Sequence, residues 1–251
     1  MSQASGSRSL LDHFSALADP RLPRVRATFA AAHDVPRGLT ADRYAAELCD
    51  RILPEALSAF PSALNDVTCE RGVFTPDQAA AILAVASRLG AGNKVHADAF
   101  SDSNGWEVAV ASGALSADHL TFTSPAAIRR HAGTETVATV LPMAELVYMT
   151  SRRAPARAFI EHDVPLAVAT DYCSSIGATS LQRAMILAAP WFGLSPEEAL
   201  VAATLNAAYA LGAQAESGSV DIGKRGDLVV FAQPTLDDVF WAEPEPPAVV
   251  L

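Results

Sequence analysis

The chain has 251 residues and a formal charge of −10; hydrophobic residues make up 50% of it and charged residues 18%. This composition supplies enough apolar material for one large α/β domain, or for one domain and part of another, and it argues against disorder. Basic pairs such as Arg129-Arg130 are isolated in an acidic chain, whereas phosphate-backbone binding needs clustered Lys and Arg. We therefore expect no nucleic-acid partner.

Cysteine spacing and hydropathy indicate the cellular compartment of the protein. Cys49, Cys69 and Cys173 are widely spaced and form no CxxC pattern, so they indicate neither a disulfide framework nor a structural zinc site. No apolar run approaches the ~18 residues that a membrane span needs. The residues after Met1 lack the basic and apolar regions of a secretory signal. We expect a cytoplasmic protein that has no contact with a membrane.

Six short apolar runs alternate with helical patterns along the chain. The predicted strands are Val25–Phe29, Asn65–Cys69, Lys94–His96, Leu115–His119, Thr136–Leu141 and Val164–Thr170. The predicted helices are Thr40–Leu57, Asp77–Leu89, Ala126–His131 and Ala199–Ala203. Three of these helices follow a Thr-Pro or Ser-Pro start signal, at Thr75, Ser124 and Ser195. Such alternation is typical of parallel strands joined by crossover helices.

The pattern changes after Leu211. The segment Gly218–Phe231 reads as turn, strand, turn and strand, and the closing Pro244–Pro247 stretch is expected to be irregular. We therefore divide the chain into a partial β/α barrel domain, residues 1–212, and a small β element with a tail, residues 213–251.

Four chemically competent side chains follow the predicted strands. His33 comes after the first strand, His96 and His119 end the third and fourth, and Asp171 ends the sixth. In a β/α barrel the carboxyl ends of the strands meet at one shared mouth, so these four groups should converge. Imidazole and carboxylate are ligands of catalytic divalent metals, and a carboxylate that contacts the reacting water can also carry its proton.

Several segments together resemble imidazolonepropionase, a metal-dependent amidohydrolase of histidine breakdown. They are Thr28-Phe29-Ala-Ala-Ala-His33, Cys69-Glu-Arg-Gly-Val-Phe74, Val95-His-Ala-Asp98, Ser116-Ala-Asp-His-Leu120, Ala169-Thr-Asp171, Thr204-Leu-Asn-Ala-Ala-Tyr-Ala-Leu-Gly212 and Gly223-Lys-Arg-Gly-Asp-Leu228. The resemblance runs from about Leu10 to about Phe231. It implies an α/β fold, a TIM-type (β/α) barrel of the amidohydrolase type that lacks its first two strands and ends in a short β element.

The resemblance also implies a reaction and residue roles. The reaction is hydrolysis of a ring amide C–N bond, which converts imidazolone propionate to formimino-glutamate. His96 would be a metal ligand, Asp171 a metal ligand and proton shuttle, His119 a group that orients or polarises the carbonyl and water, and His33 a substrate contact. The cofactor would be one divalent metal, zinc or iron.

The chain departs from the family pattern at four points. Ala99 stands where the family has a Glu that contacts the substrate ring. Tyr172-Cys-Ser-Ser175 replaces an Asn-Pro-Gly-like turn, and Leu141-Pro-Met-Ala-Glu145 replaces a Leu-Pro-Gly-Thr-like strand end. None of the six histidines forms the His-X-His pair that supplies two metal ligands in such enzymes. His96 and Asp171 are then two ligands where a catalytic zinc normally has three from protein, so a tightly held ion is not expected from this chain alone.

Three interpretations stay open. The first is a hydrolase of cyclic amide C–N bonds whose missing parts come from an upstream segment or a partner chain. The second is a non-catalytic binding or interaction protein built on the same scaffold. The third is a metal-independent hydrolase or lyase acting on another small ring, with His119 and Asp171 as an acid–base pair. Because an open barrel has unpaired edges, we expect a homo-oligomer or a partner chain that covers them.

Overall fold

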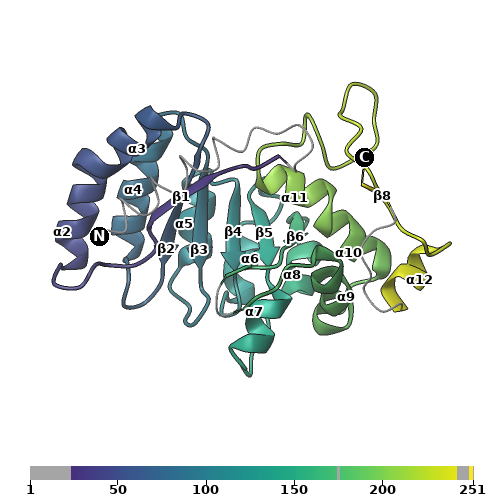
Figure 1. Ribbon diagram of the computed structural model, residues 1–251. Coiled ribbons are helices and arrows are strands. Elements are labelled where there is room, and N and C mark those ends of the chain that lie inside the picture. Colours follow the sequence, from purple (N-terminus) through teal and green to yellow (C-terminus); the bar gives the residue numbers. More distant parts are fainter. Residues whose placement is uncertain (1–23, 174–175, 242–248, 251) are drawn as a thin grey trace. The chain divides into compact units, whose positions relative to one another are not determined.

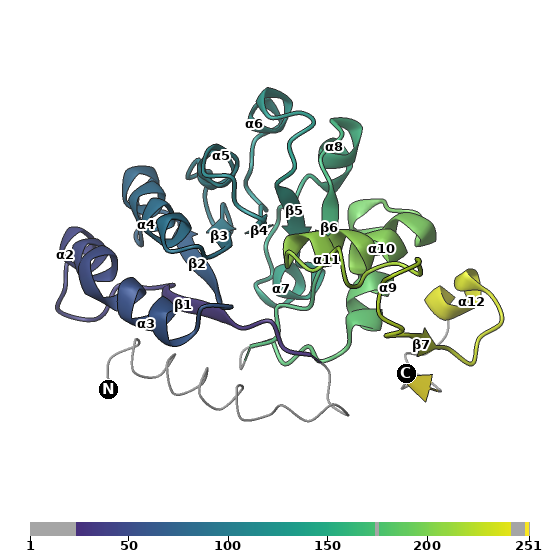
Figure 2. The same ribbon diagram turned by 90° about the horizontal axis from the view of Figure 1, so that it is seen from above.

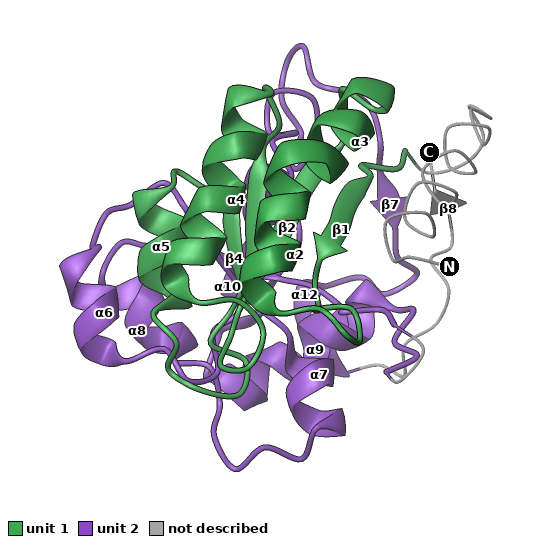
Figure 3. Ribbon diagram, turned by 90° about the vertical axis from the view of Figure 1, so that its left-hand side faces the viewer, with its two compact units in different colours: residues 1–118 green, residues 119–251 purple. Residues whose placement is uncertain are grey.

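The computed structural model describes residues 24–173, 176–241 and 249–250. The chain forms two compact units, Met1–Asp118 and His119–Leu251, coloured separately in Figure 3. Six strands, β1 to β6, alternate with helices along the two units, and within each unit the strand order of the sheet follows the order of the chain.

Unit 1 contains a parallel sheet. Its strands are β1 (Thr28–Ala32), β2 (Leu64–Cys69) and β3 (Asn93–Ala97), and β4 (Ser116–His119) begins in it. In the register of β2 and β3, Asp66 lies opposite Lys94 and Thr68 lies opposite His96. Because side chains alternate along a strand, these four residues share one face of the sheet, and the apolar Val67 and Val95 occupy the other. Both valines are fully buried, so the apolar face is the core side.

The helices of unit 1 are α2 (Ala41–Glu47), α3 (Leu53–Ala59), α4 (Pro76–Arg88) and α5 (Gly105–Ala111). Figures 1 and 2 show α2, α3 and α4 on the same side of β1 and β2. The predicted helix Asp77–Leu89 is confirmed as α4, which begins with a reciprocal capping box between Thr75 and Gln78. The predicted helix Thr40–Leu57 is not a single α-helix, because a π-helical turn at Leu48–Ile52 joins α2 to α3.

Unit 2 contains the parallel strands β5 (Val137–Val140) and β6 (Leu166–Val168), paired in the register Ala138 to Leu166. Its helices are α6 (Pro125–Arg130), α7 (Pro142–Val147), α8 (Ala156–Glu161), α9 (Leu181–Phe192), α10 (Pro196–Ala203), α11 (Leu205–Ala210) and α12 (Leu236–Trp241). Ser124 and Ser195 cap α6 and α10 as predicted. Small residues at the helix surfaces, such as Ala210 against Val137 and Ala167, allow close packing on the two strands.

The carboxyl-terminal segment differs in part from its prediction. Within Gly218–Phe231 the structure has one strand, β7 (Val229–Val230), and its antiparallel partner is β8 (Val249–Val250). Helix α12 lies between β7 and β8 and has Asp237 and Asp238 in its first turn. The turn pattern of the sequence did not predict this helix. The irregular Pro244–Pro247 stretch lies outside the described residues. The division at residue 212 stays a prediction.

All six predicted strands are present, with shifted ends. The largest shift is in the first, which lies at Thr28–Ala32 and not at Val25–Phe29 because pairing of Thr28 with Leu64 sets its register on β2. Over the described residues, no helix is long and apolar enough to cross a membrane.

Candidate functional site

Unit 1 brings His33 and His96 together. The two imidazole rings meet edge to face with centroids 4.8 Å apart. His33 Nε2 also lies 4.0 Å from Asp66 Oδ2, and 49% of the His33 side chain is exposed, compared with 14% for Asp66. Burial, followed by the neighbouring His33, lowers the pKa of His96 to about 4. His96 is therefore a neutral imidazole at neutral pH, the form that binds metals or accepts hydrogen bonds.

A charged cluster lies on the same face of the sheet as His96. Lys94 Nζ lies 3.1 Å from Asp118 Oδ2 and donates to Ser116 Oγ. Asp66 stands opposite Lys94 in the register, and burial, reinforced by Asp118, raises the pKa of the Asp66 carboxyl. Asp66 Oδ1 is buried without a hydrogen-bond partner among the described residues. Charged side chains that are largely withdrawn from water cost free energy unless they are paired, so this cluster is a candidate functional feature of unit 1.

The loop that follows His96 is fixed by the buried Asp98. Its carboxylate accepts hydrogen bonds from the backbone N–H groups of Ser103 and Gly105, each at 3.0 Å, and it closes the first turn of α5. Asp98 itself has a left-handed backbone, with φ 51°. Ala99, the next residue, is 6% exposed, and its methyl side chain brings no hydrogen-bonding group to the loop.

Glu70, at the end of β2, fastens the same loop. Its carboxylate accepts from the Phe100 N–H at 3.0 Å, from Ser103 Oγ at 2.9 Å and from the Ser101 hydroxyl. Burial by itself raises the pKa of Glu70, but these hydrogen bonds outweigh it and the net pKa is lowered. Glu70 is thus an ionised carboxylate, and both of its oxygens accept hydrogen bonds that hold the loop after β3 in place.

Gly105 makes the close approach of this loop possible. A Cβ at this position would lie 2.7 Å from the Ala97 Cβ and 2.9 Å from its Cα. We expect Gly105→Ala to cost about 1 to 3 kcal/mol of unfolding free energy because the β3 backbone cannot give way. Gly226→Ala is the matched control, since nothing lies within 4 Å of its Cβ position. Chemical denaturation of both variants measures the difference, and equal stabilities would contradict this packing.

Unit 2 brings His119 and Asp171 together. His119 Nε2 lies 4.0 Å from Asp171 Oδ2; the His119 side chain is 4% exposed and that of Asp171 27%. Both residues have left-handed backbone angles, φ 77° at His119 and 50° at Asp171, and so does Leu120 at 63°. Such conformations are uncommon for residues other than glycine and cluster at functional sites. These backbone conformations lie at the end of β4 and just beyond the end of β6, and the roles of His119 and Asp171 stay predictions.

The charge of Asp171 acts on the phenol of Tyr148. Burial, followed by the charges of Asp171 and Cys173, raises the pKa of the Tyr148 phenol. Sequence patterns did not single out Tyr148, which follows α7 in an exposed apolar run that ends at Met149. Asp66 and Lys94 were missed as well. Their signal was a charged residue inside an otherwise apolar strand pattern.

The described residues do not by themselves complete a metal site. No group of three or more His, Cys, Asp or Glu side chains in the described part of the chain is placed to hold an ion. Each unit contributes one pair, His33 with His96 or His119 with Asp171, and a catalytic zinc normally has three protein ligands. The expected convergence of all four groups stays a prediction.

Comparison with solved structures identifies the fold. A zinc-bound adenosine deaminase from Xanthomonas campestris superposes with a TM-score of 0.68 at 21% identity, over 95% of this chain and 60% of the other. An ochratoxinase from A. niger gives a TM-score of 0.64 at 18% identity, over 82% of this chain and 53% of the other. These likenesses confirm the predicted α/β fold, with parallel strands that alternate with helices.

Curated relatives are closer in sequence. The imidazolonepropionase of Geobacillus kaustophilus (strain HTA426) is 40% identical over 218 residues, which is 85% of this chain and 51% of the relative. That of Geobacillus thermodenitrificans (strain NG80-2) is 41% identical over 211 residues, 82% of this chain and 49% of the relative. The chain thus spans about half the length of the curated relatives it matches. The model of the amidohydrolase family matches residues 68–249, most of the chain, and the protein therefore belongs to the amidohydrolase family.

Proposed function

We propose that the protein supplies the His33, His96, His119 and Asp171 side chains to an imidazolonepropionase-like hydrolysis of a ring amide C–N bond. The substrate is imidazolone propionate, which yields formimino-glutamate in histidine degradation, or a related small cyclic amide. The observation that carries the proposal is the His119–Asp171 pair, 4.0 Å apart at two strained strand ends, in a chain 40% identical to imidazolonepropionases.

The chemistry assigned to unit 2 is proton transfer. A water oxygen adds to the ring carbonyl carbon while the Asp171 carboxylate takes the water proton. The C–N bond then breaks, and Asp171 returns the proton to the departing ring nitrogen. His119, almost fully buried with its Nε2 4.0 Å from Asp171 Oδ2, orients and polarises the substrate carbonyl and the water. One water is consumed, and the ring opens to a carboxylic acid and a protonated nitrogen.

His33 and His96 are assigned to binding in unit 1. His33 has an exposed ring edge that can donate to or accept from a ring substrate, and its contact with His96 limits its orientation. His96 and Asp171 are the two residues assigned as ligands of a divalent zinc or iron ion. The proposal requires further ligands from a second polypeptide segment, either an upstream extension or a partner chain, in a cytoplasmic homo-oligomer or complex.

Turnover is the direct test. The 251-residue chain and the product of its upstream-extended reading frame are each assayed on imidazolone propionate with added zinc or iron. Ring opening by either preparation supports the proposal, and ring opening by the extended protein alone assigns the remaining ligands to the upstream segment. If neither preparation opens the ring under any metal condition, the proposal is wrong.

A second candidate function is a non-catalytic binding protein on the same scaffold. Ala99 favours it, because this buried methyl group stands where the family pattern has a carboxylate. Metal analysis of the purified chain separates the candidates, with His96→Ala and Asp171→Ala as comparisons. Stoichiometric metal that is lost in both variants rules out the non-catalytic candidate.

A further inference from the structure

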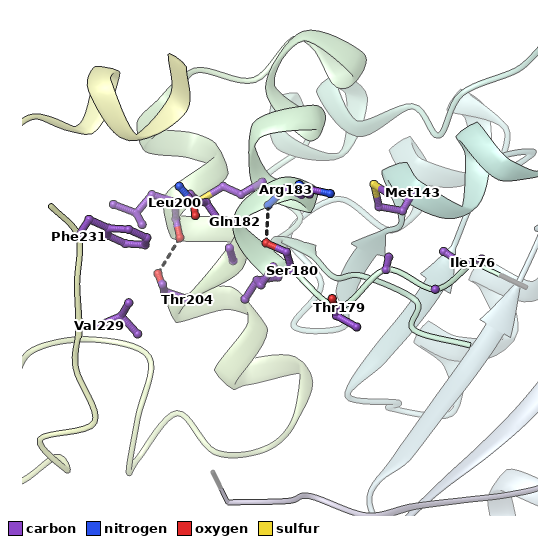
Figure 4. Close-up of a pocket in the computed structure, with 15 residues that line it drawn as sticks. Met143, Ile176, Thr179, Ser180, Gln182, Arg183, Leu200, Thr204, Val229 and Phe231 are labelled. Carbon is purple, nitrogen blue, oxygen red and sulfur yellow. Dashed lines mark hydrogen bonds between the residues drawn. The ribbon is translucent and has the colours of Figure 1, made fainter. Parts of the chain in front are cut away.

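Unit 2 contains a pocket of about 820 Å³, which Figure 4 shows in close-up. Its wall is formed by the start of α7, the segment Ile176–Ser180, the first turns of α9, the end of α10, and Val229 and Phe231. Nine of the fifteen lining residues are apolar. Pockets that bind small molecules measure about 300–1,000 Å³ and are mainly apolar with a few polar groups. The pocket therefore has the size and the lining of a ligand site.

Arg183 is the one charged residue among those that line the pocket. Among the described residues its guanidinium has neither an ion pair nor a hydrogen bond, and only its backbone N–H has a partner, Ser180 Oγ at 3.2 Å. Arg157 of the same unit differs, because it binds the Glu198 carboxylate through two hydrogen bonds, at 2.8 and 2.9 Å. An arginine without an acidic partner beside an apolar surface can bind the anionic group of a ligand.

The amino-terminal end of α9 adds positive potential to the same wall. This helix has twelve residues, Leu181–Phe192, and its first backbone hydrogen bond runs from the Ala184 N–H to the Ser180 carbonyl. The N–H groups that precede this bond carry the partial positive charge of a helix start. None of the described lining residues is acidic, although the chain has 28 Asp and Glu residues. The charge distribution of the pocket thus favours an anion and disfavours a cation.

We infer that this pocket binds an amphipathic monocarboxylate, such as the anion of a medium-chain fatty acid. The carboxylate pairs with the planar guanidinium of Arg183, and the alkyl chain is removed from water against Met185, Leu200 and Phe231. In the view of Figure 4, Arg183 lies between Leu200 and Met143, so apolar wall extends to both sides of it. The binding site is separate from the proposed hydrolysis, because none of the four residues assigned to that reaction is among the described lining residues.

Three probes test the charge and the chain of the ligand on the 251-residue protein. Isothermal titration at neutral pH compares decanoate with hexanoate and with decylammonium. We expect decanoate to bind at least about tenfold more tightly than hexanoate, because four more methylene groups leave water. Decylammonium carries the opposite charge on a chain of the same length, and it should bind at least about tenfold more weakly than decanoate.

The methionine methyl groups report where the ligand binds. Met143 and Met185 line the pocket, whereas Met149 does not line it and is 88% exposed. In protein labelled with ¹³C at the methionine methyl groups, decanoate should shift the NMR signals of Met143 and Met185 in a saturable way and leave Met149 unchanged. Adsorption of decanoate to exposed apolar surface would shift Met149 instead.

Arg183→Gln tests the carboxylate contact. This variant should lose at least about tenfold in decanoate affinity and most of its preference for decanoate over decylammonium, because a charge-assisted hydrogen bond is removed. The matched control is Arg129→Gln, since Arg129 is an exposed arginine in the last turn of α6 that does not line the pocket. Its decanoate affinity should stay within about twofold of that of the parent. Circular dichroism verifies the fold of both variants.

Several results would overturn the inference. They are the absence of saturable decanoate binding, equal affinities for decanoate and decylammonium, binding without shifts at Met143 and Met185, and equal losses in Arg183→Gln and Arg129→Gln. If the Met143 and Met185 signals change with protein concentration and not with decanoate, a second copy of the chain covers the pocket and the assigned ligand is wrong. Ring opening is measured separately, so failure of the proposed hydrolysis would leave this result unchanged.

Discussion

Asp171→Asn should lower kcat for ring opening by about 10²- to 10⁴-fold in whichever preparation turns over substrate, because an amide cannot take the proton from water. The substitution keeps the size of the side chain, and Asn tolerates the left-handed backbone that Asp171 adopts at φ 50°. Steady-state kinetics on imidazolone propionate measures the effect.

The matched control is Asp163→Asn. Asp163 is an exposed residue after α8 with φ 55°, so the backbone demand is the same and the proposed chemistry is absent. Its kcat should stay within twofold of that of the parent, about 0.4 kcal/mol in activation free energy. Asp171→Asn with nearly full kcat would remove Asp171 from the proton-transfer role, and a comparable loss in Asp163→Asn would point to a general structural effect.

Glu145→Ala should be the most destabilising single substitution considered for unit 2. The Glu145 side chain is 3% exposed and accepts from the Ala154 N–H at 2.7 Å, from Trp191 Nε1 at 2.8 Å and from Thr121 Oγ1 at 3.0 Å. Removing it leaves these buried donors without an acceptor and opens a cavity, which together cost about 3 to 4 kcal/mol of unfolding free energy. Urea denaturation measures the loss, with the exposed Glu135→Ala expected within about 0.5 kcal/mol of the parent.

The same carboxyl should make stability depend on pH. Burial raises the pKa of Glu145 above its ordinary value of 4.5, and the hydrogen bonds from Trp191, Ala154 and Thr121 offset this only in part. The folded protein then holds the proton more tightly than the unfolded chain does. The stabilising contribution is complete below pH 4.5 and is lost as the pH rises through the folded pKa.

Glu145→Gln tests this sign, because the amide stays neutral at every pH. The unfolding free energy of the parent minus that of Glu145→Gln should fall as the pH rises from about 4.5 toward neutrality. A difference that rises over this range would show that hydrogen bonding to the ionised carboxylate dominates over burial.

The amino-acid pattern was most reliable where a short segment decides the structure. Thr75, Ser124 and Ser195 each cap a helix as expected, because a hydroxyl side chain and a following proline act on backbone groups within one turn. The six strands were also found, because parallel strands buried on a core show as apolar runs. The ends of the strands do not follow from composition: β1 is displaced by three residues because its pairing with β2 sets its limits.

The candidate site divides in the same way. His33, His96, His119 and Asp171 could be chosen from sequence, because each follows an apolar run and matches a family motif. Three features could not be chosen from sequence, because they depend on atoms brought together from different segments. They are the contact of His33 with His96, the left-handed backbone of His119 and Asp171, and the anchoring of the Asp98 loop by Glu70. Long-range packing has no local signature.

The sequence by itself determined the alternation of strands and helices, the capped helix starts and the family resemblance, since these depend on neighbouring residues and on motif order. The tertiary structure alone decided that Asp66 is largely buried opposite Lys94, that Glu145 joins three separate segments, and that a pocket lined by α9 and α10 lies in unit 2. The physical reason is that burial, pKa and cavity volume are properties of side chains distant in the chain and close in space.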